Sequence, residues 1–473
     1  MDTTIEQAEA GTPPPSSGPP GVLSRKYIGL TIGVFATVFL VAFEAIAVAT
    51  AMPVVVRELD GLPVYAWAFA GFLVASMFAT VLAGNLVDRL GPFRPFVSGV
   101  GVFAVGLIVA GTAQGMSFFV LGRMLQGLGA GAILVTLDVV VARAYPEEMR
   151  PKAMSMMTAA WVLPAMVGPV VAGSLAEIGA WRWVFLGLIP LVALALSIIV
   201  RRVYALPRPS DTAAPSAGRR GLLWLALAAA VGFGLLQYAG QERTLIGLGV
   251  AAVGLALVVP SLPRLLPSGT LRFRRGLPMI VLMRGLLMGG LVGIEAFVPL
   301  MLVTHRQLSP TVAGLLFTVT TLGWAAGAWL QARPNLRISR PNLVRLGAGL
   351  MAAGALTIIA TLSVAVPVWL AMVGWTLAGM GSGMSVSTLF VLLFEVSPVE
   401  EQGANAGAIT LSDSIGQVTA VGIGGILFAG LQTTTSGALL FLPIFGLMAL
   451  VLLVGFATAS RLTAPAAEVA GRT

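Results

Sequence analysis

Long apolar stretches are the feature of this sequence that most limits how the chain can fold. A helix needs about 20 predominantly apolar residues to cross the hydrocarbon core of a bilayer. Stretches of roughly that length occur at fourteen places: 28–56, 64–87, 95–113, 117–142, 153–175, 183–203, 221–240, 244–262, 277–304, 310–331, 343–363, 367–394, 403–431 and 438–460. We therefore expect an all-α integral membrane protein with fourteen spans. The seventh and eighth stretches also admit a second interpretation, as one re-entrant hairpin.

Charged residues are too scarce for a water-soluble protein of this size. They make up 10% of the 473 residues, against about 25% in an average soluble domain. The chain has no cysteine and a single histidine, which excludes disulfides and thiolate metal ligands. The sequence shows no glycine–lysine phosphate loop and no cluster of metal ligands. We therefore expect neither a cofactor nor a metal.

The basic residues indicate how the chain is oriented in a membrane. A net charge of +9 in a soluble protein would suggest nucleic-acid binding, but here the basic residues lie in short loops between apolar stretches. If the N-terminus is cytosolic, most of them fall on the cytosolic side; Arg57, Arg182, Arg243 and Arg306 fall outside. This asymmetry follows the positive-inside rule. It predicts cytosolic N- and C-termini and no nucleic-acid partner.

The order of spans and loops predicts two six-helix bundles separated by a two-helix insert. A weak repeat supports the two halves, because residues 84–89 and 328–333 follow the second span of each bundle with a leucine and an arginine in common. Transporters built from such repeats hold their substrate near the midplane between them. The predicted segments are a disordered tail (1–22), the first bundle (23–203), a cytosolic linker (204–220), the insert (221–262), a cytosolic loop (263–276), the second bundle (277–460) and a cytosolic tail (461–473).

Five motifs carry a family resemblance. The segment GNLVDRLGPFR (84–94) resembles the loop between spans two and three of the major facilitator superfamily, and LGRMLQGLGA (121–130) resembles its fourth-span arginine motif. EAIAVATAMP (44–53) and GPVVAG (168–173) are similar to motifs of its drug–proton antiporters, and WRWVF (181–185) to its fourteen-span branch. The resemblance implies a carrier in a bacterial inner (plasma) membrane that exports small molecules in exchange for protons.

The loop motif suggests a conformational latch. Gly91 permits a tight turn, and Asp88 falls on the same side of the membrane as the start of the helix near Gly403, where a carboxylate is stabilised by the helix dipole. Asp138 is placed to pair with Arg89. The resemblance implies that this cluster, with Gly84 and Arg94, favours the outward-open state. The alternative is that the loop charges only anchor the topology.

Charged residues inside apolar spans are rare and usually functional. Glu44 falls at mid-depth in the first span, where lack of water disfavours an ionised carboxyl, so we expect it to bind either a proton or a cationic substrate. Arg123 is expected to bond backbone carbonyls or Gln126 and to influence coupling. Glu295 and Asp413 are further candidates for proton or substrate binding. The alternatives are a permanently protonated Glu44 that only packs, and ion pairs of Glu295 or Asp413 with Arg284.

The antiporter motif and several aromatic residues complete the candidate site. Gly168, Pro169 and Gly173 are expected to shape span five against a helix of the opposite bundle; the alternative is an ordinary proline kink. Some aromatic residues fall where a cavity is expected and would stack on cargo, although tryptophans in membrane proteins also favour the interface. These cavity candidates are Phe39, Phe43, Trp161, Trp324 and Trp375. We expect His305 to be solvated in an outer loop.

Together these features predict a proton-coupled exporter of amphipathic small molecules that works by alternating access and is not an enzyme. Its partners would be a small-molecule substrate, protons and membrane lipids, with no obligatory protein partner. A second hypothesis keeps the fold and makes the cargo a lipid or an endogenous metabolite, exported or flipped. A lipid-linked transferase is disfavoured because no polar catalytic cluster is visible at either interface.

Overall fold

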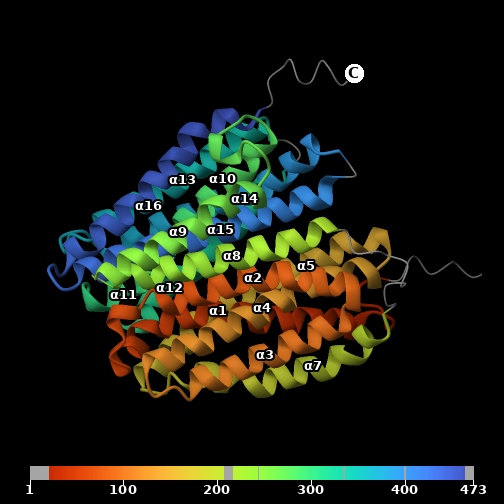
Figure 1. The fold of residues 1–473 in the computed structure, drawn as a ribbon, viewed down its shortest axis with the longest axis horizontal. Helices are drawn as coiled ribbons and strands as arrows, with labels where there is room; N and C mark the ends of the chain where they lie inside the picture. Colours follow the sequence, from red (N-terminus) through yellow and green to blue (C-terminus); the bar gives the residue numbers. More distant parts are fainter. Residues whose placement is uncertain (1–20, 207–216, 243, 334–335, 399–400, 464–473) are drawn as a thin grey trace, which may run out of the picture.

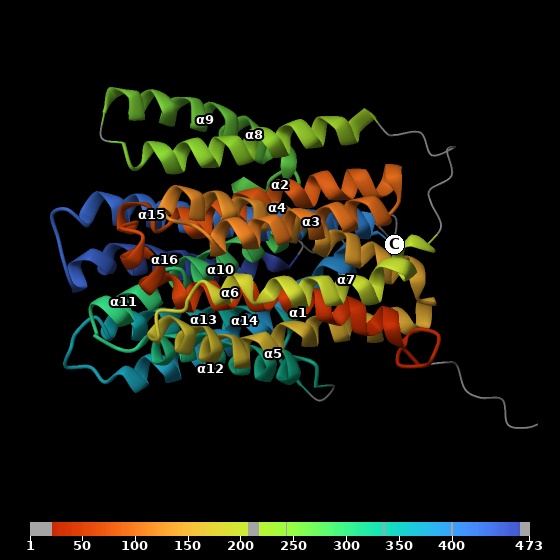
Figure 2. The same ribbon diagram turned by 90° about the horizontal axis from the view of Figure 1, so that it is seen from below.

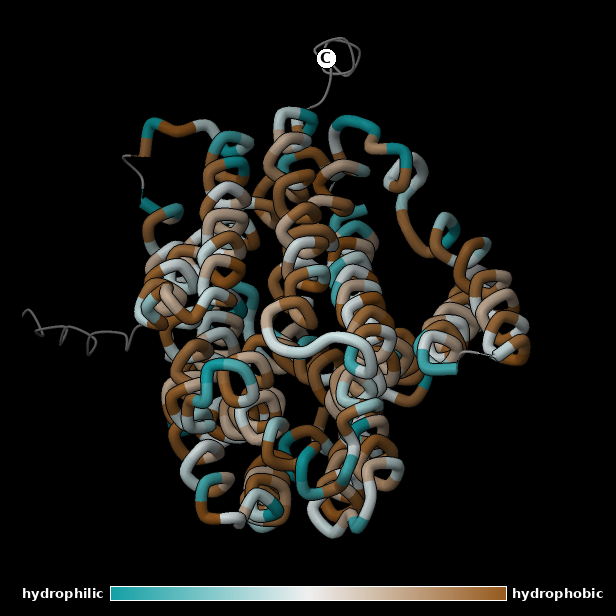
Figure 3. The backbone as a smooth tube through the Cα atoms, turned by 90° about the vertical axis from the view of Figure 1, so that its left-hand side faces the viewer, coloured by the Kyte–Doolittle hydropathy of each residue, from teal (hydrophilic) through white to brown (hydrophobic). Residues whose placement is uncertain are grey.

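The computed structural model describes residues 21–206, 217–242, 244–333, 336–398 and 401–463. Within these ranges the chain is helical and contains no strand, and fourteen helices are long and apolar enough to cross a membrane. Figure 3 shows that hydrophobic residues run along these helices while hydrophilic residues gather at their ends. The fourteen predicted spans are thus confirmed. Most of the predicted N-terminal tail, much of the linker and nearly all of the C-terminal tail lie outside the described residues.

The first bundle contains six spans, and Figure 1 colours its helices from red to yellow-green. The sixth span is interrupted at Gly187 and therefore consists of two helices, α6 and α7. The helices are α1 (Ile28–Glu58), α2 (Trp67–Leu90), α3 (Phe93–Gly111), α4 (Met116–Ala144), α5 (Arg150–Glu177), α6 (Trp183–Leu186) and α7 (Leu188–Tyr204).

The insert consists of two separate long helices, α8 (Ala217–Ala239) and α9 (Leu245–Leu265). Both contain a stretch that qualifies as a membrane span, so the interpretation as one re-entrant hairpin is wrong. Figure 2 shows the pair as a layer outside the bundles, and α8 contacts both α2 and α15. Leu245, Ile246 and Leu248 on α9 are largely exposed, as expected for side chains that face lipid.

The second bundle repeats the six-span plan. Its first span breaks at Glu295, where α10 ends and the short α11 follows. The helices are α10 (Leu277–Glu295), α11 (Val298–Thr304), α12 (Pro310–Gln331), α13 (Arg340–Ala360), α14 (Val368–Val396), α15 (Gln402–Leu431) and α16 (Ala438–Thr458). Short 3-10 turns lie at Leu62–Val64, Glu147–Met149, Thr270–Arg272 and Ala459–Leu462.

The two bundles contact each other at one end of the molecule. We name the end where α1 begins and α16 ends the terminal end, and the opposite end the far end. Towards the far end, the Tyr65 hydroxyl donates to the Ala296 carbonyl at 2.7 Å and the Thr318 hydroxyl donates to the Ala165 carbonyl at 2.9 Å. The backbone amide of Thr311 donates to Glu177 at 3.2 Å. We call this set of contacts, with the Tyr65, Phe297 and Phe428 rings, the far-end seam.

The burial of α5 shows how the seam changes along the molecule. In the half towards the far end, two neighbouring residues are buried in most turns, because α5 packs against both α1 and α12. In the half towards the terminal end, about one residue per turn is buried. The buried positions are Pro164, Ala165, Gly168, Pro169, Ala172, Gly173 and Ala176 in the first half, and Ala153, Met157 and Ala160 in the second. Along α5 the bundles are therefore in contact towards the far end and separated towards the terminal end.

Candidate functional site

A cavity of about 260 Å³ lies between the two bundles at mid-depth. Helices from both bundles line it, and most of the lining is apolar or aromatic, with a few polar groups, as is typical of small-molecule sites. The lining residues are Ala45, Ile46, Ala49, Phe69, Phe72, Leu73, Arg123, Trp161, Val292, Glu295, Ala296, Phe317, Gln417 and Val421. We call this the central cavity.

Arg123 on α4 connects the cavity with a buried carboxylate. Its Nη1 donates to Glu44 Oε1 and, at 2.7 Å, to Gln126 Oε1, while its Nε donates to the Ala68 carbonyl at 3.0 Å. The guanidinium also lies over the Phe72 ring, 4.5 Å from its centre. The predicted contacts with Gln126 and a backbone carbonyl are confirmed, whereas the ion pair with Glu44 was missed.

Glu44 lies behind Arg123 and does not line the central cavity. Its side chain is fully buried, and its Oε2 has no hydrogen-bond partner among the described residues. We expected this carboxylate to contact a cationic substrate directly. In this structure that contact is blocked, because Arg123 takes the position between Glu44 and the cavity.

Glu295 is the carboxylate that reaches the central cavity. It ends α10 in the middle of the membrane-spanning stretch and is partly buried. Within the described part of the chain it makes neither a hydrogen bond nor an ion pair. The alternative that Glu295 pairs with Arg284 is therefore wrong for this structure.

Arg284 pairs instead with Asp413. This ion pair was the alternative to a role of Asp413 in proton or substrate binding. Arg284 Nη2 and Nε donate to Asp413 Oδ2 at 2.6 and 3.0 Å, and both side chains are 13% exposed. Gln417, one helical turn further along α15, donates to Asp413 Oδ1 at 2.8 Å and lines the cavity. The ion pair therefore touches the cavity through an amide side chain.

The predicted latch is only partly present. Gly91 has a φ of 76° and makes the expected turn, but the described residues contain no ion pair between Arg89 and Asp138. Asp88, Arg89 and Asp138 are all exposed near the terminal end, where the bundles are separated. The role of these residues as a latch, together with Gly84 and Arg94, therefore stays a prediction.

The antiporter motif packs as predicted. Gly168 faces α1, and a Cβ placed on Gly173 would come within 2.5 Å of Thr311 Cα on α12. Pro169 contacts Gly314 of the same helix. The motif therefore lets α5 approach a helix of the opposite bundle closely at the far-end seam.

The aromatic candidates were mostly placed wrongly. Trp161, which is 39% exposed, lines the cavity, but the other four do not. Phe39 and Phe43 stack on each other along α1, Trp375 is buried within the second bundle, and Trp324 lies on α12 away from the lining. Sequence reasoning missed Phe69, Phe72 and Phe317, because the rotation of an apolar helix leaves no signal in its sequence.

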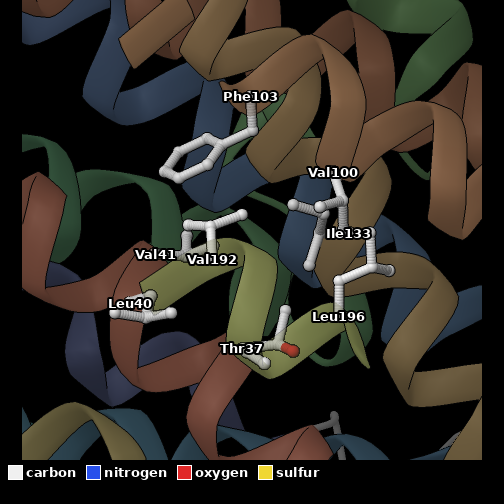
Figure 4. A pocket seen from close by; sticks show the side chains of 9 residues that line it. Thr37, Leu40, Val41, Val100, Phe103, Ile133, Val192 and Leu196 are labelled. Atoms are coloured by element: carbon white, nitrogen blue, oxygen red, sulfur yellow. The ribbon is translucent and has the colours of Figure 1, made fainter. Parts of the chain in front are cut away.

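One other expectation and one small pocket concern places away from the central cavity. His305 is partly buried, and one of its ring nitrogens lies 2.8 Å from the Leu362 carbonyl, so the expected solvated histidine is wrong. The pocket in Figure 4, between Thr37, Val100, Ile133 and Val192, measures about 10 Å³. A void of that size holds roughly one water molecule and is too small for cargo.

Comparison with known proteins decides the family. The family model described as Major Facilitator Superfamily matches residues 34–295, which is more than half of the chain. The chain belongs to the major facilitator superfamily. It is therefore a multi-pass membrane protein of that superfamily.

Relatives within the superfamily include named drug transporters. The chain is 27% identical over 442 residues to an uncharacterised MFS-type transporter of Mycobacterium tuberculosis (strain CDC 1551 / Oshkosh), covering 88% of this chain but only 61% of that relative. It is 23% identical over 389 residues to the multidrug efflux pump SdrM of Staphylococcus aureus (strain N315), covering 79% of this chain and 84% of SdrM. It is 25% identical over 403 residues to the multidrug transporter MdtP of Bacillus subtilis (strain 168), covering 84% and 74%.

Solved structures support the fold. A D-xylose–proton symporter superposes with a TM-score of 0.63 at 15% identity, covering 92% of this chain and 97% of that structure. The peptide transporter PepTSo superposes with a TM-score of 0.67 at 14% identity, covering 91% and 98%. At such low identity these matches bear on the fold alone.

Proposed function

We propose that this protein exports amphipathic small molecules in exchange for protons by alternating access in a bacterial plasma membrane, with both termini in the cytosol. The observation that carries the proposal is the buried Glu44–Arg123 ion pair at the wall of the central cavity. The names of SdrM and MdtP as multidrug transporters support the cargo class. The distribution of basic residues supports the orientation.

The ion pair gives protons a way to act on cargo without contacting it. Protonation of Glu44 removes the negative charge that neutralises Arg123, and a guanidinium does not lose its own proton in proteins. Arg123 then presents an uncompensated positive charge to the cavity that it lines. A proton and a cationic substrate therefore exclude each other through Arg123, although they do not share an atom.

Alternating access requires the contacts of the far-end seam to break and reform. In the proposed orientation the far end is extracellular, so the structure is closed to the outside, and cargo enters between the separated terminal ends of the bundles. Each hydrogen bond across the seam contributes about 1 kcal/mol. Such contacts break and reform at low cost when the bundles rock about the cavity.

Transport into proteoliposomes under an imposed pH gradient tests the proposal. When protons flow out of the proteoliposomes down their gradient, the wild type should accumulate a fluorescent cationic dye inside. Glu44→Gln should lose this uphill accumulation. Glu395→Gln is a matched control, because Glu395 pairs with Arg340 on the exposed surface.

Exchange without a gradient separates a coupling defect from misfolding. In Glu44→Gln the charge of Arg123 stays uncompensated, so the folded variant should exchange the cationic dye more weakly than the wild type, whereas folded Glu44→Asp, which keeps the negative charge, should still exchange internal for external dye. Uphill transport by Glu44→Gln at the wild-type rate would refute the coupling role. Movement of labelled phospholipid by the wild type, without dye transport, would instead favour the lipid or metabolite hypothesis.

A further inference from the structure

The charges around the central cavity do not balance. Glu44 of α1 is paired with Arg123 of α4, and Asp413 of α15 is paired with Arg284 of α10. The lining residues from α2, α5 and α12 are apolar or aromatic. Glu295 is left without a partner among the described residues, so the cavity and its immediate surroundings carry one net negative charge when Glu295 is ionised.

The backbone at Glu295 contributes partial charges of both signs, because α10 ends there and α11 begins at Val298. Glu295 is the last residue of α10, and the carbonyl groups at the C-terminal end of a helix carry a partial negative charge. Arg284, the cation that shares α10 with it, is engaged by Asp413. A carboxylate in such surroundings is costly to leave ionised unless a cation approaches it.

The rest of the lining suits the body of an organic cation. Phe69, Phe72 and Trp161 contribute aromatic rings from the first bundle, and Phe317 contributes one from the second bundle. Aromatic faces attract cations and also pack against apolar groups. The Phe72 ring already has a cation over it, namely the Arg123 guanidinium.

We propose that Glu295 binds the positive charge of the cargo, so that the cargo is an amphipathic monocation with an apolar or aromatic body. This inference rests on the proposed function and names its substrate class. Glu44 then senses the proton, Glu295 selects the cargo, and Arg123 connects the two sites.

A stoichiometry follows from the charge balance. With Glu44 ionised, the pairs cancel and Glu295 attracts one monocation. With Glu44 protonated, Arg123 and Glu295 compensate each other across the cavity, and the monocation is released. One proton replaces one positive charge, so the exchange is electrically neutral.

The break in the first span of the second bundle links cargo binding to the seam. Ala296, the residue after Glu295, accepts the Tyr65 hydroxyl bond of the far-end seam. A cation that draws the Glu295 side chain into the cavity should therefore shift the backbone of Ala296, which accepts the Tyr65 hydrogen bond. Tight neighbours of this kind transmit a local shift to an interface.

Binding of a matched pair of probes tests the proposal. Tetraphenylphosphonium is a permanent cation, and triphenylphosphine oxide is a neutral molecule with a similar aromatic body. The wild type should bind the cation at least about tenfold more tightly, as expected for a charge-assisted contact in a partly dry site. Glu295→Gln should remove most of this preference, Glu295→Asp should retain part of it, and Glu395→Gln should leave it unchanged.

Transport of the same probes distinguishes this inference from the proposed function. If Glu295→Gln remains folded and keeps the cation preference, or if the wild type prefers the neutral probe, Glu295 does not select the cargo. Proton-driven transport of a neutral compound would leave the proposed function standing in that case. If the wild type transports no cargo in response to a proton gradient, the proposed function itself is overturned. A membrane potential that changes the rate of proton–cation exchange would refute the neutral stoichiometry.

Discussion

Replacing Glu44 with glutamine should destabilise the protein through the charge that remains on Arg123. The substitution keeps the size of the side chain and an acceptor oxygen but removes the negative charge beside the guanidinium. Arg123 is buried and retains only neutral acceptors, Gln126 and the Ala68 carbonyl. Because arginine cannot discharge itself by losing a proton, the unpaired charge stays in the protein.

The expected cost is about 3–5 kcal/mol, the usual penalty for removing one partner of a buried ion pair. Adding Arg123→Met to Glu44→Gln removes the second charge as well, with a side chain of similar length. The double variant should therefore recover at least about 2 kcal/mol relative to Glu44→Gln, as coupled neighbours do in a double-mutant cycle. It leaves Gln126 and the Ala68 carbonyl without their donor, which is why recovery should be incomplete.

Unfolding of the purified variants in mixed micelles of dodecyl maltoside and sodium dodecyl sulfate measures these free energies. Glu395→Gln serves as the control, because an exposed pair contributes about 0–1 kcal/mol. A Glu44→Gln protein as stable as the wild type, or a double variant less stable than either single variant, would show that the two residues do not form an energetically coupled pair.

Two further predictions concern the seam and the packing of the second bundle. Tyr65→Phe removes the hydroxyl bond to Ala296 but keeps the ring; with about 1 kcal/mol lost, opening of the far end should rise roughly fivefold. Because the chain has no cysteine, a single Thr311→Cys substitution reports this opening through reaction with a membrane-impermeant maleimide, and an unchanged rate would contradict the prediction. Gly327→Ala places a Cβ against the Met380 carbonyl oxygen and should cost about 1–3 kcal/mol, whereas Gly446→Ala, which meets open space, should cost nothing measurable in the same unfolding assay.

Local sequence was sufficient to predict the spans but not their rotations. The predicted span 403–431 corresponds to α15 (Gln402–Leu431), because about 20 apolar residues in a row are enough for a helix to be stable across a bilayer. In lipid, the buried and the lipid-facing sides of a helix are both apolar, so no amphipathic pattern shows which side points inward. Phe39 and Trp375 were placed in the cavity for this reason, and Phe72 was overlooked.

The buried ion pairs required knowledge of which spans are neighbours. Glu44 and Arg123 are 79 residues apart, and nothing local connects them. One general signal was present: opposite charges at similar depth in one bundle are expected to meet, because an isolated charge in a membrane is expensive. Gln417 also carried a signal, since it lies one helical turn from Asp413 and is polar within an apolar stretch.

The small free energy of the hydrogen bonds across the far-end seam is a condition for the coupling proposed here. The Tyr65, Thr318 and Thr311 bonds together contribute about 3 kcal/mol. A ligand shifts an equilibrium between two states only by the difference in its affinity for them. A cation bound about 100-fold more tightly in one state supplies about 2.7 kcal/mol, which is of the same size as the seam bonds. A seam with several additional ion pairs would exceed what one cargo molecule can supply, and the bundles would no longer exchange sides during transport.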